Sequence, residues 1–113
     1  MTRLGDLGFG RSFGIVTAEN PRGRALPEPV NAVRIEALRA EVAGLGVAWL
    51  GVVACSPDRS HCEESIAISI EMRSLIGIAQ RYDQLAVFWF DGAAFWIEPV
   101  RSSNARLRLP VSI

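Results

Sequence analysis

The side chains best suited to chemistry in this 113-residue chain include a histidine beside an acid. His61, the single histidine, stands two residues before Glu63, and side chains two apart in an extended segment point to the same face. A histidine next to a carboxylate can act as a general acid and base, or supply half of a metal site. We therefore predict His61 and Glu63 as catalytic residues. The alternative is a surface histidine beside a solvated acid.

Further polar side chains stand where apolar runs begin and end. Thr17 and Asn20 follow one such run, and Gln84 precedes another. Strand ends and loops are common places for binding groups. Asn20 either contacts a ligand or closes an Asx turn. Gln84 either binds a ligand amide or caps a helix. We expect Thr17, Asn20 and Gln84 to be ligand-binding residues.

A helix start with an arginine nearby predicts an anion site. Asn31 is a predicted N-cap, because its side-chain oxygen can accept from an otherwise unpaired backbone N–H. Arg34 comes one turn later, and a helix N-terminus with an arginine is suited to anions. The alternative is that Arg34 pairs with a surface acid such as Glu36.

The two cysteines predict no metal site. Cys55 and Cys62 are seven residues apart without a second pair, which matches no zinc-binding spacing. We therefore predict neither a metal nor a cofactor. In a cytoplasmic protein both cysteines would be reduced thiols, although they could also face each other across a hairpin and form a bridge.

Composition narrows the class of protein. Half of the residues are hydrophobic, enough for one domain with its own core. The formal net charge of zero argues against a nucleic-acid binder held by bulk charge. No apolar run approaches the ~20 residues that span a bilayer, and residues 1–11 lack the apolar segment of a signal peptide. We expect a cytoplasmic protein that does not bind membranes.

Hydrophobic periodicity predicts the elements that position these side chains. Helical spacing predicts two helices, one from Asn31 to about residue 45 and one from Met72 to Tyr82. Apolar runs predict strands at 13–18 and 47–54, and the second of these is typical of a strand buried on both faces. The alternation of Ile66, Ile68 and Ile70 with small side chains predicts a further strand over 65–70. Asp91-Gly92 between two further apolar runs, 85–90 and 93–97, predicts a hairpin with a type I′ turn.

The resulting order β-α-β-β-α-β-β predicts an α+β fold. Two helices on one face of a sheet form a two-layer sandwich, and the first six elements match a ferredoxin-like split βαβ arrangement. We expect a flexible arm over 1–12, a single domain over 13–98, and a tail over 99–113. The tail could add an edge strand.

Several of these residues also carry a family resemblance. The segment Thr17-Ala18-x-Asn20-Pro21, then Asn31, then His61-x-Glu63, then Tyr82-x-Gln84 resembles the domain of unknown function 3293 family of small bacterial proteins. The resemblance covers roughly residues 13–97. It implies a shared polar signature, and it implies no activity. The members of that signature are Thr17, Asn20, Asn31, His61, Glu63 and Gln84.

We expect a small protein that binds a polar or anionic ligand, nucleotide-like or amino-acid-like, in a pocket of loops and strand ends. One alternative is a small hydrolase or transferase with His61 as general acid and base and Glu63 as its orienting partner. Another is a protein-interaction module or a homodimer that acts through the aromatic strands, which contain Trp89 and Trp96.

Overall fold

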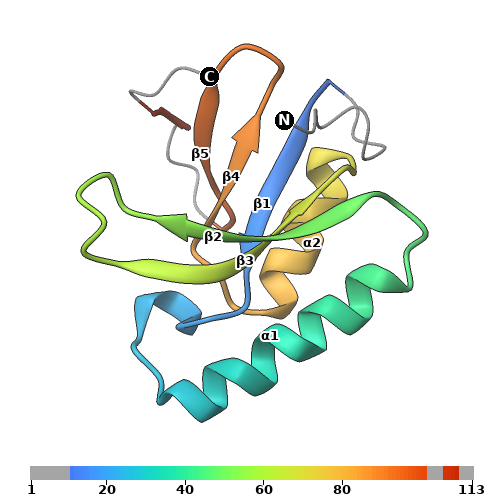
Figure 1. The fold of residues 1–113 in the computed structure, drawn as a ribbon. Helices are drawn as coiled ribbons and strands as arrows, with labels where there is room; N and C mark the ends of the chain where they lie inside the picture. The colour runs from blue at the N-terminus through green and yellow to red at the C-terminus, as the bar shows by residue number, and fades with distance from the viewer. Residues whose placement is uncertain (1–10, 102–105, 110–113) are drawn as a thin grey trace.

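The computed structural model describes residues 11–101 and 106–109, and over these ranges it contains two α-helices and one six-stranded sheet (Figure 1). This confirms the α+β class. The elements in chain order are β1 (Phe13–Thr17), the short 3-10 turn η2 (Pro21–Gly23), α1 (Glu28–Ala43), β2 (Trp49–Cys55), β3 (Cys62–Ile68), α2 (Met72–Arg81), β4 (Ala86–Phe90), β5 (Phe95–Pro99) and β6 (Leu107–Arg108).

The sheet has the strand order β2-β3-β1-β4-β5-β6, and all neighbouring strands are antiparallel. Its first four strands follow the split βαβ arrangement, with β3 between β1 and β2, and β1 between β3 and β4. β5 and β6 extend the sheet beyond β4. The predicted two-layer topology is confirmed.

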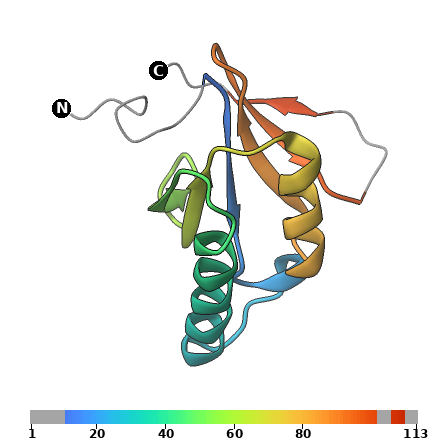
Figure 2. The same cartoon turned by 90° about the vertical axis from the view of Figure 1, so that its right-hand side faces the viewer.

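Both helices lie on the same face of the sheet (Figure 2). The helices form one layer because each has a single apolar stripe, which in α1 is Ile35, Leu38 and Val42. These side chains pack on the strand residues that point to the same side. The central core residues, all at most 2% exposed, are Val16, Leu38, Val42, Ile66, Ile68, Leu75, Ile78 and Val87.

β2 differs from the expected strand that is buried on both faces. It forms one edge of the sheet and pairs only with β3 among the described strands. Leu50 is 39% exposed and Val53 is 66% exposed. An apolar run alone does not distinguish a central strand from an edge strand, because the distinction depends on which other strands are neighbours.

The turn of the β4–β5 hairpin also differs from the predicted one. Phe90 pairs with Phe95, so the loop is Asp91–Ala94 rather than two residues. Asp91 Oδ1 accepts hydrogen bonds from Ala93 N and Ala94 N, both at 2.8 Å. Within the loop only Gly92 has a positive φ, 100°. The predicted type I′ turn is wrong, because the Asp91 carboxylate stabilises a wider loop.

Gly14 allows α2 to approach β1 closely. A Cβ atom at Gly14 would lie 2.0 Å from Cδ2 of Leu75 and 3.2 Å from Cε3 of Trp89. Leu75 is fully buried and cannot swing into solvent. We expect Gly14→Ala to lower the free energy of unfolding by about 1–3 kcal/mol, measured by urea denaturation, because overpacking a dense core strains it.

Gly51→Ala is the matched control for Gly14→Ala. Gly51 is also a strand glycine, but a Cβ there meets only Nη2 of Arg39, at 3.7 Å. We expect little change in stability from it. Equal stability of the two variants would contradict the close packing of α2 on β1.

Candidate functional site

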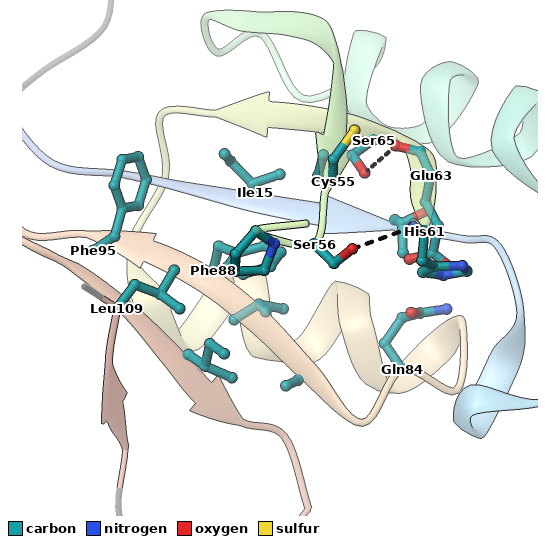
Figure 3. Close-up of a pocket in the computed structure, with 16 residues that line it drawn as sticks. Ile15, Cys55, Ser56, His61, Glu63, Ser65, Gln84, Phe88, Phe95 and Leu109 are labelled. Carbon is teal, nitrogen blue, oxygen red and sulfur yellow. Dashed lines mark hydrogen bonds and ion pairs between the residues drawn. The ribbon is translucent and has the colours of Figure 1, made fainter. Parts of the chain in front are cut away.

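The sheet face opposite the helices, which we call the open face, carries a hollow of about 530 Å³ (Figure 3). Its floor comes from three adjacent strands. Ile15 of β1 pairs with Phe88 of β4, and Phe88 pairs with Ile97 of β5, so the three side chains lie side by side. A volume of roughly 300–1,000 Å³ is typical of small-molecule sites.

Polar side chains gather at one end of this hollow. His61, Glu63 and Gln84 line it and also line a smaller hollow of about 240 Å³ beside the loop after β1. In Figure 3 these three lie together, whereas Phe95 and Leu109 lie at the opposite end. The site therefore has a polar end and an apolar end.

Glu63 is held in place through one of its two carboxylate oxygens. Asn20 Nδ2 donates a hydrogen bond to Glu63 Oε2 at 3.0 Å, and Nε2 of His61 lies 3.4 Å from the same oxygen. The side chain of Glu63 is 22% exposed. Among the described residues, none donates a hydrogen bond to Oε1, which remains available.

His61 reaches the site from the loop between β2 and β3. Ser56 N donates to the His61 carbonyl at 2.8 Å, and His61 N donates to Ser56 Oγ at 3.2 Å. Hydrogen bonds from the Ser60 backbone and hydroxyl and from the Ser56 hydroxyl lower the pKa of Asp58 to about 2. The loop backbone is thus fixed, while the imidazole itself is 64% exposed.

The two cysteines lie at the base of the same loop. Cys55 and Cys62 are a register pair at the ends of β2 and β3, and a disulfide joins them. The structure therefore has the bridge rather than two reduced thiols. Within residues 11–101 and 106–109, no group of three or more His, Cys, Asp or Glu side chains is placed to hold a metal ion.

Gln84 is 7% exposed and its amide is fixed by backbone contacts. Its Nε2 donates to the carbonyls of Glu19 at 3.0 Å and Tyr82 at 3.2 Å. No other described residue donates to its Oε1, and this atom is not sealed in the interior. Gln84 therefore presents a hydrogen-bond acceptor to the hollow that it lines.

Asn31 is not the N-cap of α1. The helix begins at Glu28, with Pro27 as N-cap residue and a proline in its first turn, a position where proline is well tolerated. Asn31 is buried inside the helix, where its Oδ1 accepts from Asn20 N at 3.0 Å and its Nδ2 donates to Asn20 Oδ1 at 2.9 Å. The predicted N-cap was wrong because Pro27 and Pro29 indicate a loop in the sequence, whereas they lie at the start of the helix.

Asn20 has a structural role in the loop after β1 and also contacts Glu63 in the candidate site. Its backbone is left-handed, with φ 47°, and its Oδ1 also accepts from Leu26 N at 3.0 Å. Its Nδ2 then points to Glu63. Asn20 and Asn31 together fix the loop between β1 and α1, and through it the orientation of the Glu63 carboxylate.

Arg34 lies outside the residues that line the two hollows. Its Nε donates to the Ala18 carbonyl at 2.6 Å and its Nη2 to the Tyr82 carbonyl at 2.5 Å. Because α1 begins at Glu28, Arg34 is not at a helix start. It joins the ends of β1 and α2, and Glu36 pairs with Arg39 instead.

Thr17 lines the hollow, but its hydroxyl is already engaged. Thr17 Oγ1 donates to the Glu64 carbonyl at 2.7 Å and accepts from Glu19 N at 3.1 Å. It therefore shapes the wall and ties β1 to β3. Of the seven predicted site residues, the structure places Thr17, His61, Glu63 and Gln84 at the larger hollow, Asn20 at the smaller one, and Asn31 and Arg34 behind them.

The apolar floor formed by Ile15, Phe88 and Ile97 was not among the features predicted from the sequence. A signal for it is present. In residues 13–17 and 86–90 apolar side chains occupy both alternating sets of positions, although two helices can cover only one face of a sheet. The second apolar set predicts either a binding surface or a further covering element.

Neither helix of the described chain is long and apolar enough to cross a bilayer. No curated protein matches the sequence. A family model for a protein of unknown function, DUF3293, matches residues 16–87. This range includes the end of β1, both helices, β2, β3, the start of β4 and all of the predicted site residues. The chain belongs to the DUF3293 family, and the family resemblance drawn from its polar signature is confirmed.

Proposed function

We propose that the protein binds a small organic molecule with an apolar body and a polar head group in the hollow of the open face. One observation carries the proposal: a hollow with an apolar floor ends at three polar side chains, His61, Glu63 and Gln84. Sites for small molecules combine an apolar lining with a few polar groups that fix orientation. The apolar floor favours a more amphipathic ligand than the nucleotide-like one expected from the sequence.

The contacts favour binding over catalysis. A hydrolase or transferase that uses His61 as general base needs a nucleophile or a positioned water beside it. The hydroxyls that line the hollow already donate elsewhere: Thr17 to the Glu64 carbonyl, Ser65 to the Glu63 carbonyl, and Ser56 to Asp58 Oδ1. His61 with Glu63 remains a candidate acid–base pair, and the polar end supports recognition more directly.

A pocket-filling variant tests the proposal. Ala86 lines both hollows, so we expect Ala86→Phe to occupy the space that a ligand needs. The probe is 2-phenylethanol, and its binding is measured by isothermal titration calorimetry or by NMR titration. We expect saturable binding to wild type and at least tenfold weaker binding to Ala86→Phe.

Val53→Phe serves as the control, because Val53 is 66% exposed on β2 and does not line either hollow. It should bind the probe like wild type. Equal binding of the probe to Ala86→Phe and to wild type would contradict the proposal. A dimer that Ala86→Phe dissociates, detected by light scattering, would instead assign the open face to a second copy of the chain.

A further inference from the structure

The polar end of the open-face hollow presents acceptors. Glu63 Oε1 receives no hydrogen bond from the described residues, and Gln84 Oε1 is likewise without a donor among them. Both side chains are oriented by other contacts, Glu63 by Asn20 Nδ2 at 3.0 Å and Gln84 by the carbonyls of Glu19 and Tyr82. Two fixed acceptors at one end of a hollow favour a ligand group that donates hydrogen bonds.

The ionisable side chains among the described lining residues are Glu63 and His61. Glu63 is the only acid among the described lining residues, and no arginine of the described chain lines either hollow. Arg34, the nearest candidate for an anion contact, donates to two backbone carbonyls instead. An anionic head group would therefore meet the Glu63 carboxylate with no arginine to hold it, whereas a cation would neutralise the charge of that carboxylate.

His61 does not satisfy the Glu63 carboxylate. Its Nε2 lies 3.4 Å from Oε2, longer than the roughly 2.7–2.9 Å of a charge-assisted hydrogen bond. The imidazole is also 64% exposed and can turn away when a ligand enters. The carboxylate thus retains most of its capacity for an incoming donor.

The rest of the hollow suits the remainder of such a ligand. Phe88 and Phe95 line it, and aromatic faces attract cations as well as packing against apolar groups. Figure 3 shows Phe88 between the polar end and Phe95, so an apolar body attached to the head group would extend over the rings.

From these contacts we propose that the head group is an ammonium, so that the ligand is an amphipathic amine whose nitrogen donates to Glu63 Oε1 and Gln84 Oε1. This inference rests on the proposed function, since it specifies the ligand of the same hollow. It replaces the expected anionic head group, because the arginine meant to hold an anion lies elsewhere.

Three probes with one body test the head group. They are 2-phenylethylamine, 2-phenylethanol and 3-phenylpropanoate, with dissociation constants measured at pH 7 and low salt. We expect the amine to bind at least tenfold tighter than the alcohol, and the carboxylate to bind weakest. In Glu63→Gln the amine should lose its advantage while the alcohol changes less than twofold.

Two features make Glu63→Gln interpretable. Glutamine keeps an oxygen for Asn20 Nδ2, so the loop contact is retained. Glu64→Gln is the matched control, because Glu64 is adjacent in β3 but lies 3.8 Å from Arg39 and lines neither hollow. It removes the same charge and should leave amine binding unchanged. If Glu63→Gln fails to fold, the ranking of the three probes on wild type still tests whether the head group is an ammonium.

The outcomes separate the two proposals. If none of the probes binds, the proposed function itself is overturned. If the alcohol or the carboxylate binds as tightly as the amine, the site stands and the ammonium head group is wrong. If Glu64→Gln reduces amine binding as much as Glu63→Gln, the effect is general electrostatics and the assignment to Glu63 is wrong.

Discussion

Replacing Asn31 with alanine should lower the free energy of unfolding by about 2–4 kcal/mol. Asn31 is buried, its Oδ1 accepts from Asn20 N, and its Nδ2 donates to Asn20 Oδ1 and the Leu26 carbonyl. The substitution leaves the half-buried Asn20 N and Leu26 carbonyl without these partners, and a polar group left without a partner away from water costs roughly 1–3 kcal/mol. Urea denaturation followed by circular dichroism measures the effect.

Val33→Ala controls for a change on the same helix, since Val33 is 70% exposed. We expect it to stay within about 0.5 kcal/mol of wild type. The stability of Asn31→Ala also shows whether Asn31, a member of the polar signature, has a structural role or a ligand-binding role. A residue kept for a ligand is often neutral or stabilising when removed, so a neutral Asn31→Ala would contradict a structural role for this side chain.

Removing the disulfide should also lower the stability of the protein by a large amount. The bridge between Cys55 and Cys62 spans a sequence separation of seven. Closing such a loop stabilises a fold by roughly 2–3 kcal/mol, because it lowers the conformational entropy of the unfolded chain. We expect Cys55→Ser/Cys62→Ser to melt about 10 °C lower than wild type, since each kcal/mol shifts the melting temperature of a domain of this size by about 4 °C.

A reductant distinguishes loss of the bridge from loss of packing. Added to wild type it should lower the melting temperature to that of Cys55→Ser/Cys62→Ser, and it should leave that variant unchanged. No response of wild type to reductant would show that the two thiols are not joined. The Ser56 and His61 backbone contacts do not involve sulfur, so the loop that carries His61 should persist without the bridge.

The sequence was sufficient for the main features of the fold. The α1 stripe of Ile35, Leu38 and Val42 and the alternation around Ile66 and Ile68 mark real buried faces, because periodicity reports directly which side of an element is covered. The edge position of β2 and the width of the Asp91 loop were not predictable in this way. They depend on neighbours in space and on one carboxylate contact.

The candidate site was only partly predictable. His61, Glu63 and Gln84 were identified as polar groups at strand ends, and the structure brings them to one end of the hollow. Arg34 was expected beside them because a helix start at Asn31 would have placed it there. The first turn at Glu28 moves Arg34 to the backbone of β1 and α2. The floor of the hollow required knowledge of which face the helices leave open.

The central claim is that the open-face hollow is a ligand site, and intermolecular nuclear Overhauser effects test it most directly. With 2-phenylethylamine bound, we predict effects from its ring protons to the side-chain methyls of Ile15 and Ile97 and to the ring of Phe88, with none to Leu38 in the helix-covered core. Effects confined to any other part of the surface would contradict the claim, whatever the affinity.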